Sequence, residues 1–337
     1  MLSQPILGSV SFLRGYTLPT DSLQLRDDLL DCLPSLVLDR PLAVSGQRVV
    51  YLGHFKDSLI PKDVLPPSGD DPDEKPFLHG WEDWGQIVVK VVQDADRENI
   101  VRLQAEADIL TELRPINFPR LLFSNLFTEN PVTEEDLFAR LYVTIEEFID
   151  GNPLNEISKD FIGNEKRTAQ TALGIANALL PLWNHPKRFV HRDIKPANVL
   201  IRRNGEVVVI DLGIVRETGS PGVTRAGFAQ APHTAGYAAP EQIANEKLLI
   251  CFKTDFFSIG VLMYFLFSGL KPFEPKPNMD HYEILIATRN IVPNSLNRIS
   301  SSSDRFSEFV DKALQKEQFK RHRTPAIFID ELNSICG

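Results

Sequence analysis

Residues 191–200 read HRDIKPANVL, and the tripeptide DLG follows at residues 211–213. This stretch contains several side chains that phosphoryl transfer requires. Asp193 can accept or orient the proton of an attacking hydroxyl group, and Lys195 supplies a cation for the transferring phosphate. The amide and carboxylate oxygens that Mg²⁺ prefers are offered by Asn198 and Asp211. A lone Asp or Asn is usually a solvated surface or turn residue, but the complete string at this spacing is a strong signal.

The pattern HRDxKPxN followed by DLG resembles the catalytic loop and metal-binding motif of the eukaryotic-type (Hanks-type) protein kinases. The resemblance covers roughly residues 40–335. It implies an α+β, bilobal protein-kinase-like fold with a small β-rich N-lobe and a larger α-helical C-lobe. It also implies ATP as the phosphate donor, with Mg²⁺, or alternatively Mn²⁺, held by Asn198 and Asp211.

A lysine of the third strand is the next family feature, and IVVK at residues 87–90 matches it. The resemblance implies that Lys90 reaches the α/β-phosphates and pairs with Glu106, which opens the family's ExxIL pattern at residues 106–110. Taken alone, Lys90 would read as a lysine at a strand edge that extends to solvent. Glu112 is the rival partner, but its position on the helix should turn it away.

The segment LYVTIEEFIDG at residues 141–151 resembles the fifth strand and the hinge of the family. The resemblance implies that the backbones of Glu147 and Ile149 contact adenine. Glu146 then occupies the gatekeeper position behind the base, where an apolar residue or Thr is usual. Either this carboxylate pairs with a cation or the alignment is displaced by one residue, and the sequence leaves both open.

The nucleotide loop departs from the family pattern GxGxxGxVY, because residues 43–51 read AVSGQRVVY. Glycines in such a loop let the backbone approach phosphates closely. Val50 matches the pattern, but none of the three glycine positions holds glycine and only the neighbouring Gly46 is present. Ser45, Gly46 and Arg48 could contact phosphates through a different geometry. This departure lowers the expected ATP affinity and leaves the fold assignment intact.

Residues 211–241 resemble an activation segment, ending in HTAGYAAPE where the family has GTxxYxAPE. The resemblance implies that Thr234 contacts Asp193 and Lys195 and favours Ser/Thr acceptors over Tyr.

Arg192 beside the catalytic Asp is a ready cation for a phosphate on this segment, which would order it through charge-assisted hydrogen bonds. Thr224 is the preferred phosphorylation site and Ser220 the second candidate, with an unmodified loop as the alternative.

Two further segments resemble structural motifs of the C-lobe. TDFFSIG at residues 254–260 implies that Asp255 holds the backbone of the catalytic loop. LQKEQFKR at residues 314–321 implies that Arg321 pairs with Glu241.

The domain organisation expected for the 337 residues has three parts: an N-terminal extension (1–38), a kinase N-lobe (39–149) and a kinase C-lobe (150–337). In the extension, residues 23–33 have the apolar spacing of a short helix, with Asp21 and Ser22 placed to cap it, and we expect it to dock onto the main body. The acidic, proline-rich insert at about residues 56–85 is predicted to be a long surface loop.

Hydrophobic patterning predicts the remaining elements. Strands are expected at residues 48–55, 86–92, 121–127, 140–149, 189–190, 199–201 and 207–210, helices at 99–113 and 168–183, and mostly helix from about 242 onwards.

Composition narrows the class of protein further. The net charge of −9 disfavours nucleic acid as a partner. The apolar stretch at residues 261–270 is too short for a membrane span of about 20 residues. No membrane partner is therefore expected. Three widely separated cysteines give no disulfide or zinc pattern, so a cytoplasmic location is expected.

The predicted function is ATP-dependent phosphorylation of Ser/Thr hydroxyls on protein substrates, with autophosphorylation of the activation segment. The first alternative is a pseudokinase that uses the fold for binding, motivated by the altered glycine loop, Glu146 and the acidic insert. The second is a small-molecule kinase, disfavoured by the YxAPE and DxxSxG motifs. A regulatory partner could bind the N-terminal extension or the acidic insert.

Overall fold

The computed structural model describes residues 21–44, 48–56, 84–94, 97–113, 117–212, 216–217 and 234–337. The chain divides by its internal contacts into two compact units. The first comprises Met1–Ala95 and Asn125–Ile145, and the second comprises Asp96–Ser124 and Glu146–Gly337.

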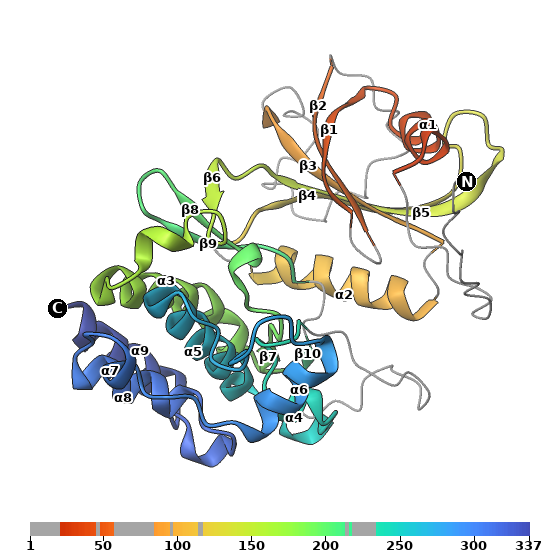
Figure 1. Cartoon of the computed structure of the whole chain (residues 1–337). Coiled ribbons are helices and arrows are strands. Elements are labelled where there is room, and N and C mark those ends of the chain that lie inside the picture. Colours follow the sequence, from red (N-terminus) through yellow and green to blue (C-terminus); the bar gives the residue numbers. More distant parts are fainter. Residues whose placement is uncertain are drawn as a thin grey trace, which may run out of the picture. The chain divides into compact units, whose positions relative to one another are not determined.

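The first unit is built on a five-stranded sheet with strand order β1-β2-β3-β5-β4 (Figure 1). Its strands are β1 (Leu36–Val44), β2 (Val49–Phe55), β3 (Ile87–Gln93), β4 (Leu121–Glu129) and β5 (Asp136–Glu147). The first three pair antiparallel. Strands β2 to β5 were predicted from the sequence, β2 and β3 from their β-branched residues, but β1 was not.

Strand β1 contains Pro41, which argues against a central strand because proline lacks the N–H that a ladder needs. In the described sheet β1 lies at the edge and pairs with β2, and an edge position is compatible with proline.

Helix α1 (Leu23–Cys32) forms at the predicted position and packs into the first unit. Ser22 Oγ accepts the N–H of Leu25, which caps the helix. Asp21 has another role than the predicted cap: its carboxylate accepts from Arg26 Nε at 2.7 Å and from the hydroxyl of Tyr51, on β2, at 2.8 Å. The apolar face of the helix is fully buried at Leu25, Leu29 and Cys32.

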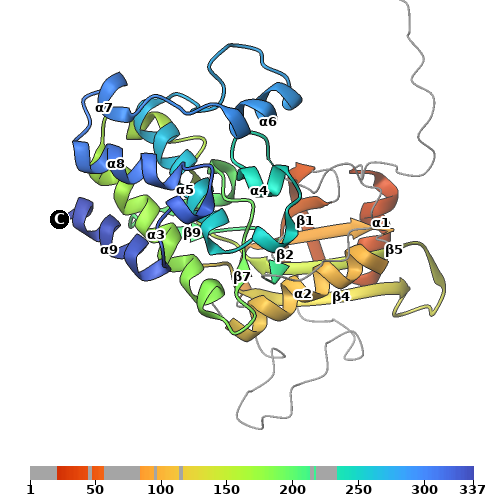
Figure 2. The same cartoon turned by 90° about the horizontal axis from the view of Figure 1, so that it is seen from below.

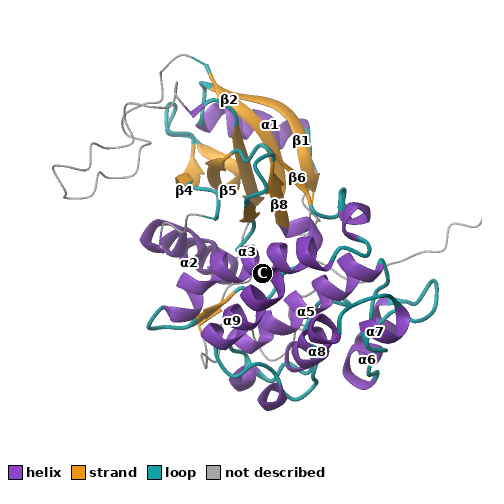
Figure 3. Ribbon diagram, turned by 90° about the vertical axis from the view of Figure 1, so that its left-hand side faces the viewer, coloured by secondary structure: helices purple, strands orange, loops and turns teal. Residues whose placement is uncertain are grey.

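The second unit is mainly helical (Figure 3). Its helices are α2 (Arg97–Leu113), α3 (Glu165–Asn184), α4 (Pro240–Ile243), α5 (Phe252–Ser268), α6 (His281–Asn290), α7 (Leu296–Ile299), α8 (Asp304–Ala313) and α9 (Pro325–Cys336). Short strands β6 (Gly151–Pro153), β8 (Val199–Arg202) and β9 (Val207–Val209) form one small sheet, and β7 (Phe189–Val190) pairs with β10 (Arg216–Glu217).

Helix α5 is the centre of this unit, with α3 and α8 packed against it (Figure 2). Thirteen of its residues are buried, which explains its unusually apolar sequence. Gly260 allows the close approach of α8, because a Cβ there would lie 2.7 Å from Cβ of Ala313. Among the described residues, no helix combines the length and apolar character that a membrane crossing requires.

The prediction of an α+β fold, with a β-rich part followed by a mainly helical part, is confirmed. Helix α2 groups by contacts with the second unit, whereas the predicted N-lobe range of 39–149 includes it. The physical reason is visible in the core: Ile109 and Leu110 of α2 are buried among the side chains of the helical unit.

Candidate active site

The catalytic-loop segment lies between β7 and β8 and contains a short 3-10 turn, Pro196–Asn198. Asp193 is the centre of its hydrogen bonds. Lys195 Nζ lies 2.6 Å from Asp193 Oδ2, and Thr234 Oγ1 donates to Oδ1 at 2.7 Å. Asn198 Nδ2 donates to both the main-chain oxygen (2.9 Å) and Oδ2 (3.1 Å) of Asp193. Three residues therefore fix the direction in which the Asp193 carboxylate points.

Thr234 also accepts a hydrogen bond of 3.0 Å from Lys195 Nζ. Asp193, Lys195 and Thr234 thus form a closed triangle of hydrogen bonds, although about 40 residues separate Thr234 from the other two. Both of these Thr234 contacts are expected from the sequence, and the structure places the three side chains together.

The backbone of the catalytic loop is held by Asp255, a fully buried residue of α5. Its Oδ2 accepts the N–H of His191 at 3.0 Å, and its Oδ1 accepts the N–H of Arg192 at 2.8 Å. A third donor is Trp183 Nε1, at 2.9 Å from Oδ2. Sequence reasoning missed Trp183, because an apolar-looking helix position gives no sign of a partner 72 residues away.

Burial raises the pKa of Asp255, and the donors around it oppose that rise. Carboxylates in such a site need donors to balance the loss of water. The three hydrogen bonds, from Trp183, His191 and Arg192, supply them.

His191 directly precedes Arg192 in the catalytic-loop segment. It is fully buried, and its Nδ1 accepts the N–H of Asp193 at 3.3 Å. Burial lowers the pKa of His191. Negative charge on nearby carboxylates acts in the opposite direction, and these belong to Asp255, Asp193, Asp211 and Glu106. That set places Asp211 and Glu106 within electrostatic reach of the catalytic loop, inside the same unit.

The two predicted metal ligands are tied together through the backbone. The N–H of Ile210 donates to the main-chain oxygen of Asn198 at 2.9 Å, which sets Asp211 directly after the anchored residue. Asp211 has φ of +68°, in the left-handed region that costs a non-glycine residue free energy. Such strain is typical of functional sites.

The donor set at Asn198 and Asp211 fits a magnesium–nucleotide complex. The hydrogen bonds of Asn198 described above use its side-chain nitrogen, so its oxygen is the atom suited to a hard cation. Among the described residues, no group of three or more His, Cys, Asp or Glu side chains is arranged to hold a metal.

Glu241 and Arg321 form a buried bidentate ion pair, with N–O distances of 2.8 and 2.9 Å. The side chains are only 3% and 0% exposed. Burial alone would raise the pKa of Glu241, but the hydrogen bonds and charge of Arg321 outweigh it and lower the pKa. The pair joins the end of the predicted activation segment to the segment before α9.

The first unit carries Lys90, on β3, and Val50, on β2. The two residues lie directly opposite each other in the antiparallel register, so their side chains share one face of the sheet. Lys90 is buried there. Glu106 lies in the second unit, where it is also buried, so the Lys90–Glu106 pair stays a prediction.

The predicted hinge residues lie at the end of β5 and directly after it. The N–H of Glu147 donates to the main-chain oxygen of Arg120 at 2.9 Å, and its side chain lies 3.3 Å from Arg120 Nε. Ile149 and Glu146 are both buried. Ser45 and Gly46 of the nucleotide loop, and the candidate phosphorylation sites Ser220 and Thr224, lie outside the described residues.

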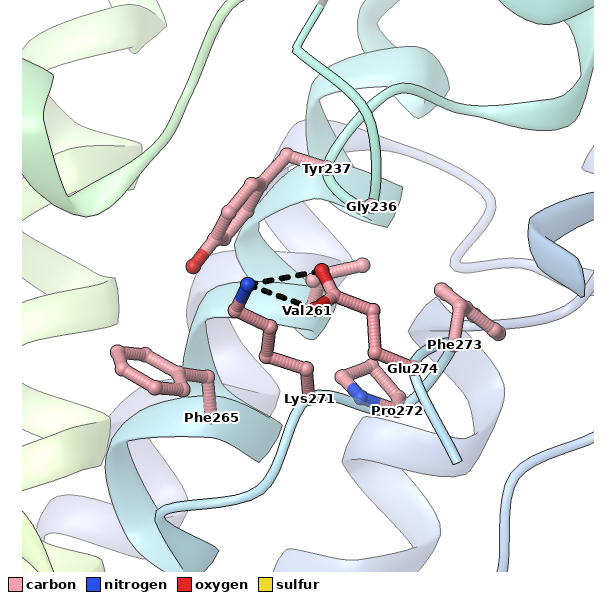
Figure 4. A pocket seen from close by; sticks show the side chains of 8 residues that line it. All are labelled: Gly236, Tyr237, Val261, Phe265, Lys271, Pro272, Phe273 and Glu274. Atoms are coloured by element: carbon pink, nitrogen blue, oxygen red, sulfur yellow. Dashed lines mark hydrogen bonds and ion pairs between the residues drawn. The ribbon is translucent and has the colours of Figure 1, made fainter. Parts of the chain in front are cut away.

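A small pocket beside Tyr237 is lined by residues of α5 and of the turn that follows it (Figure 4). Lys271 and Glu274 bond each other within it, with N–O distances of 2.8 and 2.9 Å. Its charged groups therefore neutralise one another, and none of the candidate catalytic residues lines it.

Comparison with known proteins agrees with this geometry. A family model described as a protein kinase domain matches residues 82–331, about three quarters of the chain. The chain belongs to the protein kinase domain family.

Three curated relatives illustrate the similarity, and all three come from bacteria. The chain is 39% identical over 132 residues to a probable serine/threonine-protein kinase of Streptomyces coelicolor, covering 38% of this chain and 19% of that protein. It is 25% identical over 252 residues to a probable serine/threonine-protein kinase of Clostridium perfringens, covering 74% and 34%. It is 32% identical over 191 residues to the serine/threonine-protein kinase PknA of Mycobacterium tuberculosis, covering 56% and 42%. The chain therefore matches less than half the length of each of these relatives.

Proposed function

We propose that this chain is a protein serine/threonine kinase that transfers the γ-phosphate of ATP to Ser/Thr hydroxyls of protein substrates. The observation that carries the proposal is the placement of Asp193, whose carboxylate is oriented by Lys195, Thr234 and Asn198. Catalysis of phosphoryl transfer depends on positioning and electrostatic stabilisation, so such an anchored carboxylate is the central requirement.

In the proposed mechanism, Asp193 accepts the proton of the substrate hydroxyl as that oxygen bonds to the γ-phosphorus of ATP. The bond between the γ-phosphorus and the β–γ bridging oxygen would break in the same transfer, and ADP would be the leaving group. Lys195 supplies positive charge beside the attacking oxygen, 2.6 Å from the carboxylate that takes the proton. Thr234 lies at the same point and bonds both residues, which supports its proposed role in selecting Ser/Thr acceptors.

ATP and Mg²⁺ are the proposed cofactors, with Mn²⁺ as the alternative metal. Asn198 and Asp211 would hold the metal, which neutralises charge on the phosphates when bound. Adenine would contact the backbones of Glu147 and Ile149, and the phosphates would contact Lys90 together with Ser45 and Gly46. Glu106 is the proposed partner that orients Lys90, and Val50 is the proposed apolar contact above the nucleotide.

Regulation through the activation segment is part of the proposal. Phosphorylation of Thr224, or of Ser220, would give Arg192 an anionic partner. A partner protein at the N-terminal extension or the acidic insert is a further proposed level of control. The three cysteines are free thiols, which fits the proposed cytoplasmic location.

The test is transfer of radiolabelled γ-phosphate to a generic basic protein and to the chain itself. We expect Asp193→Ala to lower the rate roughly 10²- to 10⁴-fold, as for other lost acid–base residues. Asp330→Ala is the matched control, because Asp330 is an exposed carboxylate on α9.

Two results would contradict the proposal. One is a rate for Asp193→Ala equal to that of the wild type. The other is no transfer by the wild type with either Mg²⁺ or Mn²⁺, which would favour a binding module that uses the same fold.

A further inference from the structure

Gln242 is a buried residue of the short helix α4, directly after Glu241. Its side chain makes two hydrogen bonds that use opposite ends of the carboxamide. Oε1 accepts the N–H of Ala239 at 3.1 Å, and Nε2 donates to the main-chain oxygen of Arg192 at 2.9 Å. The first bond fixes the orientation of the amide, so the end that faces Arg192 must be the donor.

Arg192 has φ of +72°, a left-handed conformation that is strained for a residue with a side chain. Strain of this kind persists where surrounding interactions hold the backbone in place. Both polar groups of the Arg192 backbone are held here: Asp255 Oδ1 accepts its N–H at 2.8 Å, and Gln242 Nε2 donates to its C=O at 2.9 Å. The two anchors come from different helices, α5 and α4.

The C=O of Arg192 belongs to the peptide bond that leads into Asp193. Because the peptide is planar, fixing this oxygen fixes the plane from which Asp193 extends. The segment that carries Gln242 also carries Thr234, whose hydroxyl donates to Asp193 Oδ1. The segment therefore contacts the catalytic loop at two points, one on the backbone and one on the carboxylate.

We propose that Gln242 is a positioning residue for phosphoryl transfer: its side-chain amide holds the carbonyl of Arg192 and thereby orients the Asp193 carboxylate. This inference rests on the proposed kinase function. It assigns to the residue after Glu241 a role that no motif in the sequence analysis identified.

Two variants test the donor directly. Gln242→Glu has nearly the same shape, but when ionised it presents an oxygen to the Arg192 carbonyl and repels it. When protonated, its O–H can donate in place of the lost N–H. Gln242→Met removes the donor at every pH.

The measurement is the ratio of variant to wild-type phosphotransfer rate at about pH 8 and at about pH 6, a range in which a buried glutamate is expected to gain its proton. The charged and titratable groups on the residues that adjoin or hold this contact are those of His191, Arg192, Asp193, Glu241 and Asp255, with Lys195 and Arg321 as partners of Asp193 and Glu241. All are present in the wild type, so the ratio removes their own pH dependence.

We expect Gln242→Glu to be roughly 10- to 100-fold slower than the wild type at the higher pH, as for a displaced catalytic group, and to recover much of this loss at the lower pH. Gln242→Met should stay slow at both. Gln315→Glu is the matched control, because Gln315 Nε2 also donates to a main-chain oxygen, that of Asp311, away from the catalytic loop. Its ratio should not rise as the pH falls.

A Gln242→Glu ratio that is equal at the two pH values would assign only a packing role and overturn the inference. A wild-type rate for Gln242→Met would do the same, and that variant decides the question if Gln242→Glu fails to fold in thermal unfolding.

Hydrogen–deuterium exchange separates this inference from the proposed function. Exchange of residues 189–199 should be faster in Gln242→Met than in the wild type at the same pH, whether or not the wild type transfers phosphate. An inactive wild type with this difference would refute the kinase proposal alone, whereas unchanged exchange would refute the positioning role.

Discussion

The indole N–H of Trp183, on α3, donates to Oδ2 of Asp255, on α5, across 2.9 Å in the core of the helical unit. The same carboxylate holds the backbone N–H groups of His191 and Arg192. Trp183 is 3% exposed, so no water replaces its donor readily. The tryptophan therefore supports the catalytic loop without lying in it.

Replacing Trp183 by Phe should remove this donor while keeping an aromatic ring. We expect the free energy of unfolding to fall by about 1.5–3 kcal/mol, the range for a lost hydrogen bond to a charged group, in addition to any packing loss. Urea unfolding measures the change. Trp84→Phe is the matched control, because Trp84 lies in the first unit and stacks edge-to-face on Phe55. An unfolding midpoint for Trp183→Phe equal to that of the wild type would contradict the assignment.

Breaking the Glu241–Arg321 pair should be among the most destabilising single changes in the chain. Arg321→Met leaves a buried carboxylate without its cation, at an expected cost of roughly 3–5 kcal/mol. Lys271→Met breaks the more exposed pair of Figure 4, for which a loss of roughly 0–1 kcal/mol is expected. Comparable losses in the two variants would show that burial of the Glu241 pair does not matter.

Arg321→Lys should fail to restore stability, although it keeps the positive charge. The guanidinium serves both carboxylate oxygens and the main-chain oxygens of Gln315, Lys316 and Lys253. An ammonium has three donors and cannot match this planar arrangement. Full stability of Arg321→Lys in urea unfolding would contradict this account.

Acid should destabilise the helical unit through His322. The ring is fully buried against Phe309 and Phe328, and burial lowers the pKa of His322 from 6.5 to about 4. Its Nε2 lies 3.0 Å from Glu331 Oε2, but the geometry is not that of a hydrogen bond, and desolvation dominates.

The sign follows from proton uptake. The unfolded chain binds a proton at His322 near pH 6.5 and the folded chain only near 4, so stability falls as the pH decreases through that window. Between about pH 7 and pH 5 this one group should cost roughly 2 kcal/mol. His322→Leu should show a smaller loss over this range in urea unfolding, with exposed His281→Gln as the control. Equal pH dependence in His322→Leu and the wild type would refute the assignment.

Helix α1 should contribute to the stability of the first unit. Leu29 is fully buried, whereas Leu23 of the same helix is 79% exposed. We expect Leu29→Ala to cost about 2–5 kcal/mol and Leu23→Ala about 0.5 kcal/mol or less. Thermal unfolding of the two variants compares them. Equal effects would mean that the helix does not pack as described.

Much of the fold and of the site could be predicted from the sequence, because the signals involved are local. The run of β-branched residues at Ile87–Gln93 and the apolar spacing of Arg97–Leu113 each indicate their own element. Asp193, Lys195 and Asn198 lie within six consecutive residues, so their chemistry and spacing are visible in a single string. The edge strand β1 was missed because Pro41 is compatible with a strand only where the neighbouring strands leave its nitrogen unpaired.

The kind of chemistry and the order of the motifs are therefore readable in the amino-acid sequence. Which side chains hold those motifs in place depends on how the chain packs. The bonds from Trp183 to Asp255 and from Gln242 to Arg192 span 72 and 50 residues. Neither residue type indicates its partner in the sequence. A buried hydrogen bond depends on how packing positions the elements that carry the two residues. That packing arises from the whole core of the unit and from no single segment of the chain.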